Sequence, residues 1–336
     1  MQTAAKQELQ NSAMMIGRGK ATRRAYGFDE IALVPGLITL DFELCDVSIT
    51  LGKHRLALPI MASAMDGVVD VKTAVIMGKL GGLGVINLQG LQTRYEDSTE
   101  AYNQVIGCDN TQFVEVMQKL YAAPVREELI ALRVKEIKAQ GVLVAASITP
   151  NMARQYGPIA VKAGVDFLFI QSTVIGIEHK TAQGNTQLDL KAFCAEIGVP
   201  VIVGNCVTYD AALRLLDTGV EGILVGVGPG AACTSRGVLG IGVPMATAIA
   251  DCSAAKADYE ARTGRKVTMI ADGGMAVGGD ICKAIACGAN AVMIGSPLAR
   301  AEEAPGRGFH WGMATPSPVL PRGTRIKVGR VGKLEQ

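Results

Sequence analysis

Short apolar runs alternate with longer amphipathic segments along most of this chain. We expect eight runs to form strands: residues 58–62, 83–87, 142–147, 166–171, 200–205, 222–226, 267–272 and 291–295. Most are continuous and apolar, as expected for parallel strands buried on both faces. The segments between them, such as AALRLLDTGVE and DICKAIACGAN, read as amphipathic helices followed by a glycine. This repeated order predicts a single-domain α/β (β/α)8 TIM barrel, and an open doubly wound sheet of about six strands is the alternative.

Two segments are longer than a barrel requires. Residues 88–141 predict a mostly helical insertion, and residues 300–336 follow the last strand and are rich in Gly, Pro and Arg. Long irregular connections are usually functional or mobile, so we expect residues 300–336 to form a mobile flap. Residues 1–15 read as a flexible tail and residues 16–336 as one catalytic domain, with no linker to a second domain.

The composition excludes several classes of function. Of 336 residues 49% are hydrophobic, which is enough for a large core. The net charge is +2 and aromatic residues make up only 4%, so neither phosphate-backbone binding nor base stacking is favoured and we expect no nucleic-acid partner. No apolar run reaches about 18 residues without Gly, Pro or charge, so we expect no membrane span.

The cysteines and histidines indicate a protein with reduced thiols and without a zinc site. The eight cysteines include no C-x-x-C pair, and only three histidines are present. Both facts argue against zinc. The first residues, MQTAAKQELQ, do not resemble a secretory signal, so we expect a cytoplasmic protein with reduced thiols.

A glycine-rich loop after the sixth predicted strand carries the first chemical signal. Active sites of TIM barrels lie at the carboxyl ends of the strands. The loop GVGPGAACTSR (226–236) places Cys233 beside the polar residues Ser235 and Arg236. This cysteine is a candidate nucleophile. The alternative is a glycine-rich turn that contains a small buried cysteine.

The next two strand ends carry signals for a phosphorylated ligand. Asp272, Gly273 and Gly274 end the seventh predicted strand, and Gly295 and Ser296 end the eighth. The carboxylate is suited to a ribose diol and the glycine amides to a phosphate, and TIM barrels commonly bind phosphate after these two strands. Taken alone, Asp272 is equally consistent with a helix N-cap.

Together these motifs resemble the IMP dehydrogenase and GMP reductase family. The matching phrases are PIMASAMDGV (59–68), GGLGVIN (81–87), VIVGNCVT (201–208), LVGVGPGAACTSRGVLGIGVPMATAI (224–249), IADGGMAVGGDICKAIACGANAVMIGSPLA (270–299), EEAPG (302–306) and HWGM (310–313). The match covers roughly residues 16–336. It is strongest to the IMP-dehydrogenase-related subgroup without CBS domains, a finer match carried by IGRGKATRRAYGFDEIALVPG (16–36) and HWGMATPSPVLPRGTR (310–325). Residues 88–141 are too short for a CBS pair, which agrees with that subgroup.

The resemblance implies an NAD-dependent oxidation of IMP to XMP in guanine nucleotide synthesis. Cys233 matches the family nucleophile, which attacks carbon 2 of the purine, and water then hydrolyses the covalent thioimidate. Ser235 stands where a helper hydroxyl is common. Arg322 and Arg325 are candidates for the hydrolytic arginine of the flap.

Further site residues are assigned by the same resemblance. The substrate is expected to contact Ser63, Met65, Ala231, Asp272, Gly273, Gly274, Gly295, Ser296, His310, Gly312, Met313 and Ala314. NAD is expected to contact Gln171, Ser172, Thr173, Asn205, Gly226, Val227 and Gly228. Backbone carbonyls of Gly228, Gly230 and Cys233 match a K⁺ site. The family's assembly implies a homotetramer or an octamer, with the tetramer favoured.

Three departures from the family pattern keep alternatives open. Gln171 stands where the family usually has Asp, the flap is short, and the chain ends at Gln336, where relatives continue with a strand and a helix. The alternatives are an NADPH-dependent GMP reductase, a purine-nucleotide-binding protein with little turnover, and a flavin oxidoreductase barrel. Residues 315–333 contain no Asp or Glu to protonate departing ammonia, which argues against the reductase.

Overall fold

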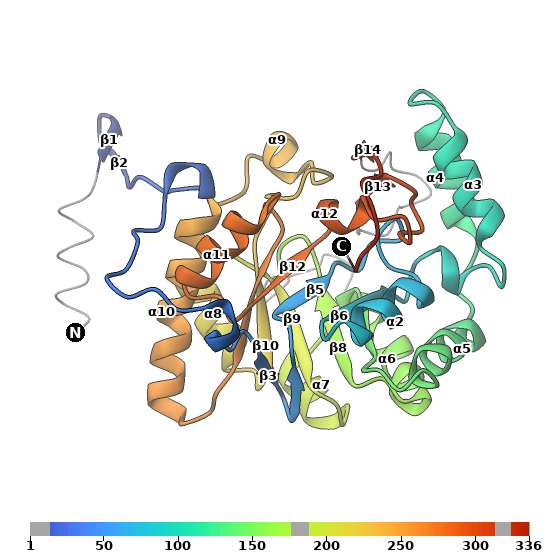
Figure 1. Ribbon diagram of the computed structural model, residues 1–336, viewed down its shortest axis with the longest axis horizontal. Helices are drawn as coiled ribbons and strands as arrows, with labels where there is room; N and C mark the ends of the chain where they lie inside the picture. The colour runs from blue at the N-terminus through green and yellow to red at the C-terminus, as the bar shows by residue number, and fades with distance from the viewer. Residues whose placement is uncertain (1–13, 176–187, 313–323, 336) are drawn as a thin grey trace.

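Eight parallel strands close into a barrel in the computed structural model of this protein, which describes residues 14–175, 188–312 and 324–335. The strands are β5 (Ile60–Ala62), β6 (Leu83–Asn87), β7 (Ala145–Ile148), β8 (Phe167–Gln171), β9 (Val201–Cys206), β10 (Gly222–Val225), β11 (Thr268–Asp272) and β12 (Ala291–Ile294). Neighbours in the barrel are neighbours in the chain, and β12 pairs with β5 to close it. The predicted TIM barrel is therefore confirmed (Figure 1).

Helices between the strands cover the outer face of the barrel. They are α2 (Val71–Lys79), α5 (Glu127–Lys138), α6 (Ala153–Ala163), α7 (Leu190–Glu196), α8 (Tyr209–Leu216), α10 (Met245–Thr263) and α11 (Gly278–Ala286). Local signals set their ends. Asp70 caps α2 by accepting the Thr73 backbone N–H at 2.7 Å, and Gly164 ends α6 in the left-handed conformation. The apolar outer faces of the strands pack against these helices and form the main core.

A hairpin closes the amino end of the barrel. Its strands are β3 (Ile49–Leu51) and β4 (His54–Leu56), which pair antiparallel. Leu51 and Leu56 join the apolar side chains that fill the barrel, among them Phe167 and Phe169. Figure 1 shows β3 at the end of the barrel opposite α9 (Ser235–Leu239) and α12 (Ser296–Ala299). Only the carboxyl end of the strands is left open for a site.

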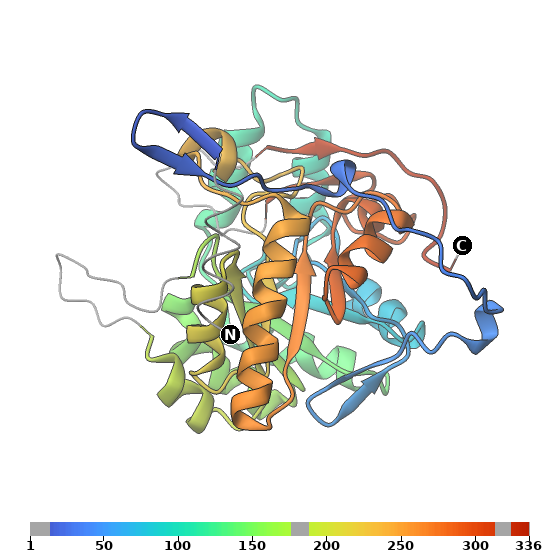
Figure 2. The same ribbon diagram turned by 90° about the vertical axis from the view of Figure 1, so that its left-hand side faces the viewer.

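The N-terminal segment runs along the outside of the barrel. After the hairpin of β1 (Met14–Gly17) and β2 (Lys20–Thr22), it includes the short 3-10 turns Phe28–Glu30 and Phe42–Leu44. Figure 2 shows this blue segment passing from the β1–β2 hairpin down to the β3–β4 hairpin. It is tied to α10 by the Thr247 backbone N–H, which donates to the Tyr26 carbonyl at 3.2 Å.

Residues 88–141 contain two helices besides α5. These are α3 (Thr99–Gly107) and α4 (Phe113–Ala122), preceded by the 3-10 turn Leu91–Thr93. They form a separate apolar cluster that includes Trp311 from the C-terminal part of the chain. Further on, β13 (Phe309–His310) pairs with β14 (Ile326–Lys327) beside α4 (Figure 1). Within the described residues, no helix is both long and apolar enough to span a lipid bilayer.

Candidate active site

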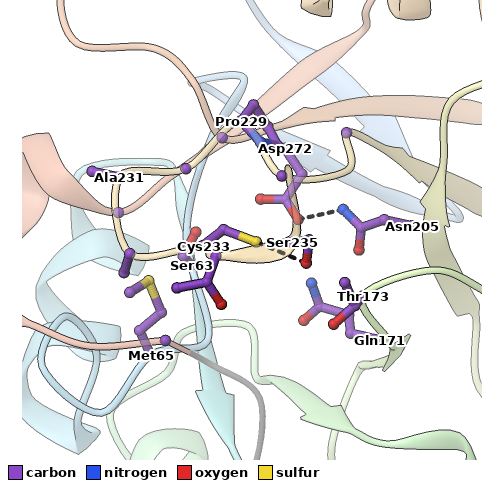
Figure 3. A pocket seen from close by; sticks show the side chains of 18 of the residues that line it. Ser63, Met65, Gln171, Thr173, Asn205, Pro229, Ala231, Cys233, Ser235 and Asp272 are labelled. Carbon is purple, nitrogen blue, oxygen red and sulfur yellow. Dashed lines mark hydrogen bonds between the residues drawn. The ribbon is translucent and has the colours of Figure 1, made fainter. Parts of the chain in front are cut away.

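A cavity of about 1280 Å³ lies over the carboxyl ends of the barrel strands. Most residues that the sequence assigned to substrate, cofactor or catalysis line it. These are Ser63, Met65, Gln171, Ser172, Thr173, Asn205, Gly226, Gly228, Gly230, Ala231, Cys233, Ser235, Asp272, Gly273, Gly274, Gly295, Ser296, His310 and Gly312. Figure 3 shows several of these side chains around the same space. The structure thus brings together assigned residues from six of the eight strand ends, Ser63 through Ser296, and from the C-terminal segment.

The loop after β10 presents Cys233 to the cavity. The thiol is exposed and donates a hydrogen bond to the Ser235 hydroxyl at 3.3 Å (Figure 3). A turn precedes it, in which the Cys233 backbone N–H donates to the Gly230 carbonyl at 3.0 Å. The Arg236 guanidinium then spans the loop by donating to the Val227 carbonyl at 3.1 Å and the Val243 carbonyl at 2.8 Å. An accessible thiol on a loop held in this way is suited to nucleophilic attack.

Glycine is required where this loop leaves the barrel. Gly226 has a φ of +147°, and a Cβ there would overlap the Asp272 carbonyl oxygen. The loop can therefore lie directly against the end of β11, which brings Cys233 and Asp272 to the same cavity.

Asp272 occupies the floor of the cavity and is anchored by one side chain. The Asn205 amide donates to Asp272 Oδ2 at 2.8 Å (Figure 3). Burial is the main influence and raises the pKa of Asp272 from 3.8 to about 6, while the bond from Asn205 opposes the rise. No helix end is capped by this carboxylate, because α11 begins at Gly278. Asp272 is thus left with unused acceptor capacity facing the cavity, as the binding of a ribose diol requires.

The ends of β11 and β12 form a small polar corner with the C-terminal segment. Gly274 has a φ of +79°, and Gly295 precedes α12. Ser296 Oγ and His310 Nε2 share a hydrogen bond of 2.8 Å. Burial lowers the pKa of His310, so the ring is neutral at physiological pH. Main-chain amides at glycines together with a serine hydroxyl are donors of the kind that bind phosphate.

On the opposite side of the cavity, β8 ends in Gln171. Its Oε1 accepts from the Ser147 hydroxyl at 2.6 Å, so the amide is held in place by the neighbouring strand β7. Ser172 and Thr173 follow and line the cavity as well. This side offers uncharged donors and acceptors, with Gln171 at the position where the family pattern usually has an aspartate.

Several assigned residues are not brought to the cavity. Val227 is buried beside it and contributes its carbonyl to Arg236 instead. The guanidinium of Arg325 donates to the Val105 carbonyl at 2.6 Å and to Asn110 Oδ1 at 3.2 Å, which ties it to α3 and its following loop. Three further assigned residues lie outside the described residues: Met313, Ala314 and Arg322.

Some cavity residues were missed by reasoning from the sequence. Gln89 and Thr149 follow β6 and β7, and the Thr149 hydroxyl donates to Gln89 Oε1 at 2.8 Å. Gln89 and Thr149 are polar residues just after predicted strands, and that position in the sequence could have identified both as cavity residues. Phe113, Met117 and Trp311 also line the cavity, but they come from α4 and the C-terminal segment. Nothing in the spacing of those residues links them to strand ends.

Comparison with known proteins identifies the family. The model of the IMP dehydrogenase / GMP reductase domain matches residues 25–314. The chain belongs to the IMP dehydrogenase / GMP reductase family. The resemblance of its motifs is therefore confirmed, and the protein is an oxidoreductase of this family.

Individual members of the IMP dehydrogenase / GMP reductase family differ in how much is known of them. An uncharacterized oxidoreductase of Mycolicibacterium smegmatis is 40% identical over 330 residues, covering 96% of this chain and 88% of that protein. An inosine-5'-monophosphate dehydrogenase of Cryptosporidium parvum is 33% identical over 296 residues, covering 83% and 69%. The crystal structure of an IMP dehydrogenase/GMP reductase-like protein from Corynebacterium glutamicum has a TM-score of 0.92 at 39% identity, covering 98% and 88%.

Proposed function

We propose that this protein is an NAD-dependent IMP dehydrogenase, which oxidises IMP to XMP for guanine nucleotide synthesis. The observation that carries the proposal is the shared cavity. An exposed thiol, a buried carboxylate with free acceptor capacity and a glycine-serine corner lie around one space. These are the groups needed to attack a purine ring while holding its ribose and its phosphate.

Binding at two ends would place the base near the thiol. Asp272 accepts the ribose hydroxyls. Ser296 and the backbone at Gly274 and Gly295 hold the phosphate, and we call this part of the cavity the phosphate corner. Fixing both ends leaves the purine little freedom, so carbon 2 meets the sulfur of Cys233 in a defined orientation. Met65 and Ser63 line the same cavity beside Gly295 and would contact the base.

The chemistry then proceeds in two steps on Cys233. The thiol gives its proton to solvent and the sulfur adds to carbon 2 as the carbon–nitrogen double bond of the ring opens onto nitrogen, while Ser235 orients the thiol through their hydrogen bond. Gln171, Ser172 and Thr173 would hold NAD⁺, which would supply the acceptor for the hydride that leaves carbon 2 as the double bond re-forms. Water next attacks carbon 2, the sulfur–carbon bond breaks, and Cys233 regains a proton as XMP leaves. Dividing the oxidation in this way replaces one difficult step by two easier ones.

The cavity has room for a second ligand beside the nucleotide. Its volume of about 1280 Å³ exceeds the roughly 300–1,000 Å³ typical of a pocket for one small molecule. Gln171, Ser172, Thr173 and Asn205 line the side away from the phosphate corner and would hold the cofactor. Gly228, Gly230 and Cys233 all belong to the loop after β10, and backbone carbonyl oxygens of this kind are suited to K⁺.

An exposed apolar segment supports self-assembly as the proposed homotetramer. Val34, Leu37, Ile38, Phe42 and Leu44 are all exposed on the N-terminal segment, Leu37 completely. Such a patch is typical of a protein interface. Light scattering on the purified protein measures the assembly, and a monomer at micromolar concentration contradicts the proposal.

Parallel assays test the proposed activity. One mixture contains IMP, NAD⁺ and K⁺, and the other contains GMP and NADPH. Formation of NADH and XMP in the first supports the proposal, whereas NADPH consumption in the second alone identifies a GMP reductase. A single burst of NADH without further turnover shows that Cys233 attacks but that hydrolysis fails. If no NADH forms at saturating IMP and NAD⁺, not even as a burst, the dehydrogenase proposal is contradicted.

A further inference from the structure

A buried chain of hydrogen bonds joins the helical insertion to the cavity. Tyr121, on α4, donates its hydroxyl proton to Asp66 Oδ2 and accepts from the indole N–H of Trp311 at 3.0 Å. Asp66 and Trp311 are 2% and 1% exposed, and Tyr121 is buried with them. Three segments that are distant in the sequence meet at this point: the β5–α2 loop, α4 and the residues after β13.

The Asp66 end of this chain is held firmly beside the cavity. The Leu91 backbone N–H donates to Asp66 Oδ2 at 3.0 Å, and a Cβ on Gly90 would overlap the other oxygen of Asp66. Met65, the preceding residue, lines the cavity. Burial raises the pKa of Asp66 to about 6, against the hydrogen bonds from Tyr121 and Leu91 and the charge of Arg94.

The Trp311 end carries the residues that complete the phosphate corner. His310 and Gly312, on either side of Trp311, both line the cavity, and His310 bonds to Ser296. Consecutive Cα atoms are about 3.8 Å apart, so a fixed indole leaves its two neighbours little freedom. Trp311 also packs against Tyr102, with the ring centroids 6.3 Å apart.

We infer that Tyr121 and Asp66 are positioning residues, which hold Trp311 in place and thereby keep His310 and Gly312 at the phosphate corner. An apolar core would need no such chain, because phenylalanine fills the space of Tyr121 without burying polar atoms. Burying a carboxyl group and a hydroxyl is costly unless they are hydrogen-bonded. Asp66 Oδ1 has no partner among the described residues, so the bonds that Oδ2 accepts from Tyr121 and Leu91 fix the position of this carboxyl group. The expected effect on IMP affinity rests on the proposed function, whereas the expected effect on the position of the Trp311 indole does not.

The test compares Tyr121→Phe with the matched control Tyr102→Phe. Both tyrosines are buried in the same cluster, but the Tyr102 hydroxyl has no hydrogen-bond partner within the described residues. Trp311 is the only tryptophan of the chain, so its fluorescence reports on this segment directly. We expect acrylamide quenching of ligand-free Tyr121→Phe to increase at least about twofold, and quenching of Tyr102→Phe to match the wild type. Equal quenching in all three proteins overturns the inference.

A second pair of variants keeps an acceptor or removes it. Asp66→Asn retains an oxygen that accepts from the Tyr121 hydroxyl, so we expect its quenching to stay as low as in the wild type. Asp66→Ala loses this acceptor, so we expect its quenching to increase. If the two variants quench alike, Asp66 does not position the indole.

Kinetics and binding test the consequence for the nucleotide. We expect Tyr121→Phe to raise both the KM and the calorimetric Kd for IMP about tenfold, with kcat changed less than about threefold and Tyr102→Phe unchanged in both. A fall in kcat at unchanged KM contradicts positioning of the phosphate corner. A wild-type protein that fails to turn over IMP counts against the proposed function alone, because the quenching experiment needs no ligand.

Discussion

Replacing Asp272 by asparagine should separate nucleotide binding from folding stability. The carboxylate is half-buried at the cavity floor with one donor, Asn205, and desolvation raises its pKa from 3.8 to about 6. When the pKa of a carboxyl group is higher in the folded than in the unfolded protein, its contribution to folding stability is fully present only at a pH below the unfolded pKa. That contribution is lost as the pH rises from 3.8 through about 6. Above pH 6 the ligand-free protein therefore carries a buried charge that asparagine removes.

The size of this effect follows from the two pKa values. A difference from 3.8 to about 6 corresponds to about 3 kcal/mol at pH 8, since each tenfold change in proton affinity equals about 1.36 kcal/mol. Asp272 keeps partial contact with solvent in the open cavity, which screens the charge. We therefore expect Asp272→Asn to raise the free energy of unfolding by about 1–3 kcal/mol at pH 8 and by about half as much at pH 5.

The same change should weaken IMP binding by at least about 100-fold, because a neutral amide replaces a charged acceptor of two hydroxyls. Urea unfolding at pH 5 and pH 8 measures the stability, and calorimetry measures the affinity. Asp280→Asn is the control: Asp280 is buried at the start of α11, where its Oδ2 accepts the Ala276 N–H at 3.0 Å, so its replacement brings no gain. A lower stability of Asp272→Asn at pH 8 refutes the burial argument, and unchanged IMP affinity refutes the ribose assignment.

Three further predictions concern the catalytic loop and the C-terminal segment. Cys233→Ala should bind IMP within about threefold of the wild type by calorimetry but form no NADH, even in the first turnover, because carbon 2 has no nucleophile; measurable turnover contradicts the covalent route. Gly226→Ala should lower kcat/KM at least about tenfold, because its Cβ would push the loop away from Asp272, whereas Gly237→Ala, where a Cβ meets open space, should keep normal kinetics. Arg325→Met should lower the urea midpoint of unfolding, because the guanidinium ties the C-terminal segment to α3 and packs over Phe113 and Phe309. The variant should still produce NADH in the steady state. A burst of NADH followed by a stall would instead assign Arg325 to hydrolysis.

The barrel and three parts of its site were predictable from local sequence pattern, whereas the other site residues were assigned through the family resemblance. Parallel strands buried on both faces read as apolar runs, and the residue that ends each run necessarily lies at one rim of the barrel. Cys233, Asp272 and Ser296 were therefore assigned to one site before any contact was known, and the structure places them around one cavity.

Contacts between segments outside the barrel repeat were decided only by the tertiary structure. Tyr121 lies on an amphipathic helix, where a tyrosine is ordinary, and nothing in its neighbourhood indicates that it meets Asp66 and Trp311. Arg325 was a candidate for the hydrolytic arginine through the resemblance to the family's flap, yet its partners lie on and after α3. The pKa of Asp272 likewise depends on burial, which several strands produce together. Periodicity reports which face of an element is buried, but the partner on that face is set by how the whole chain packs.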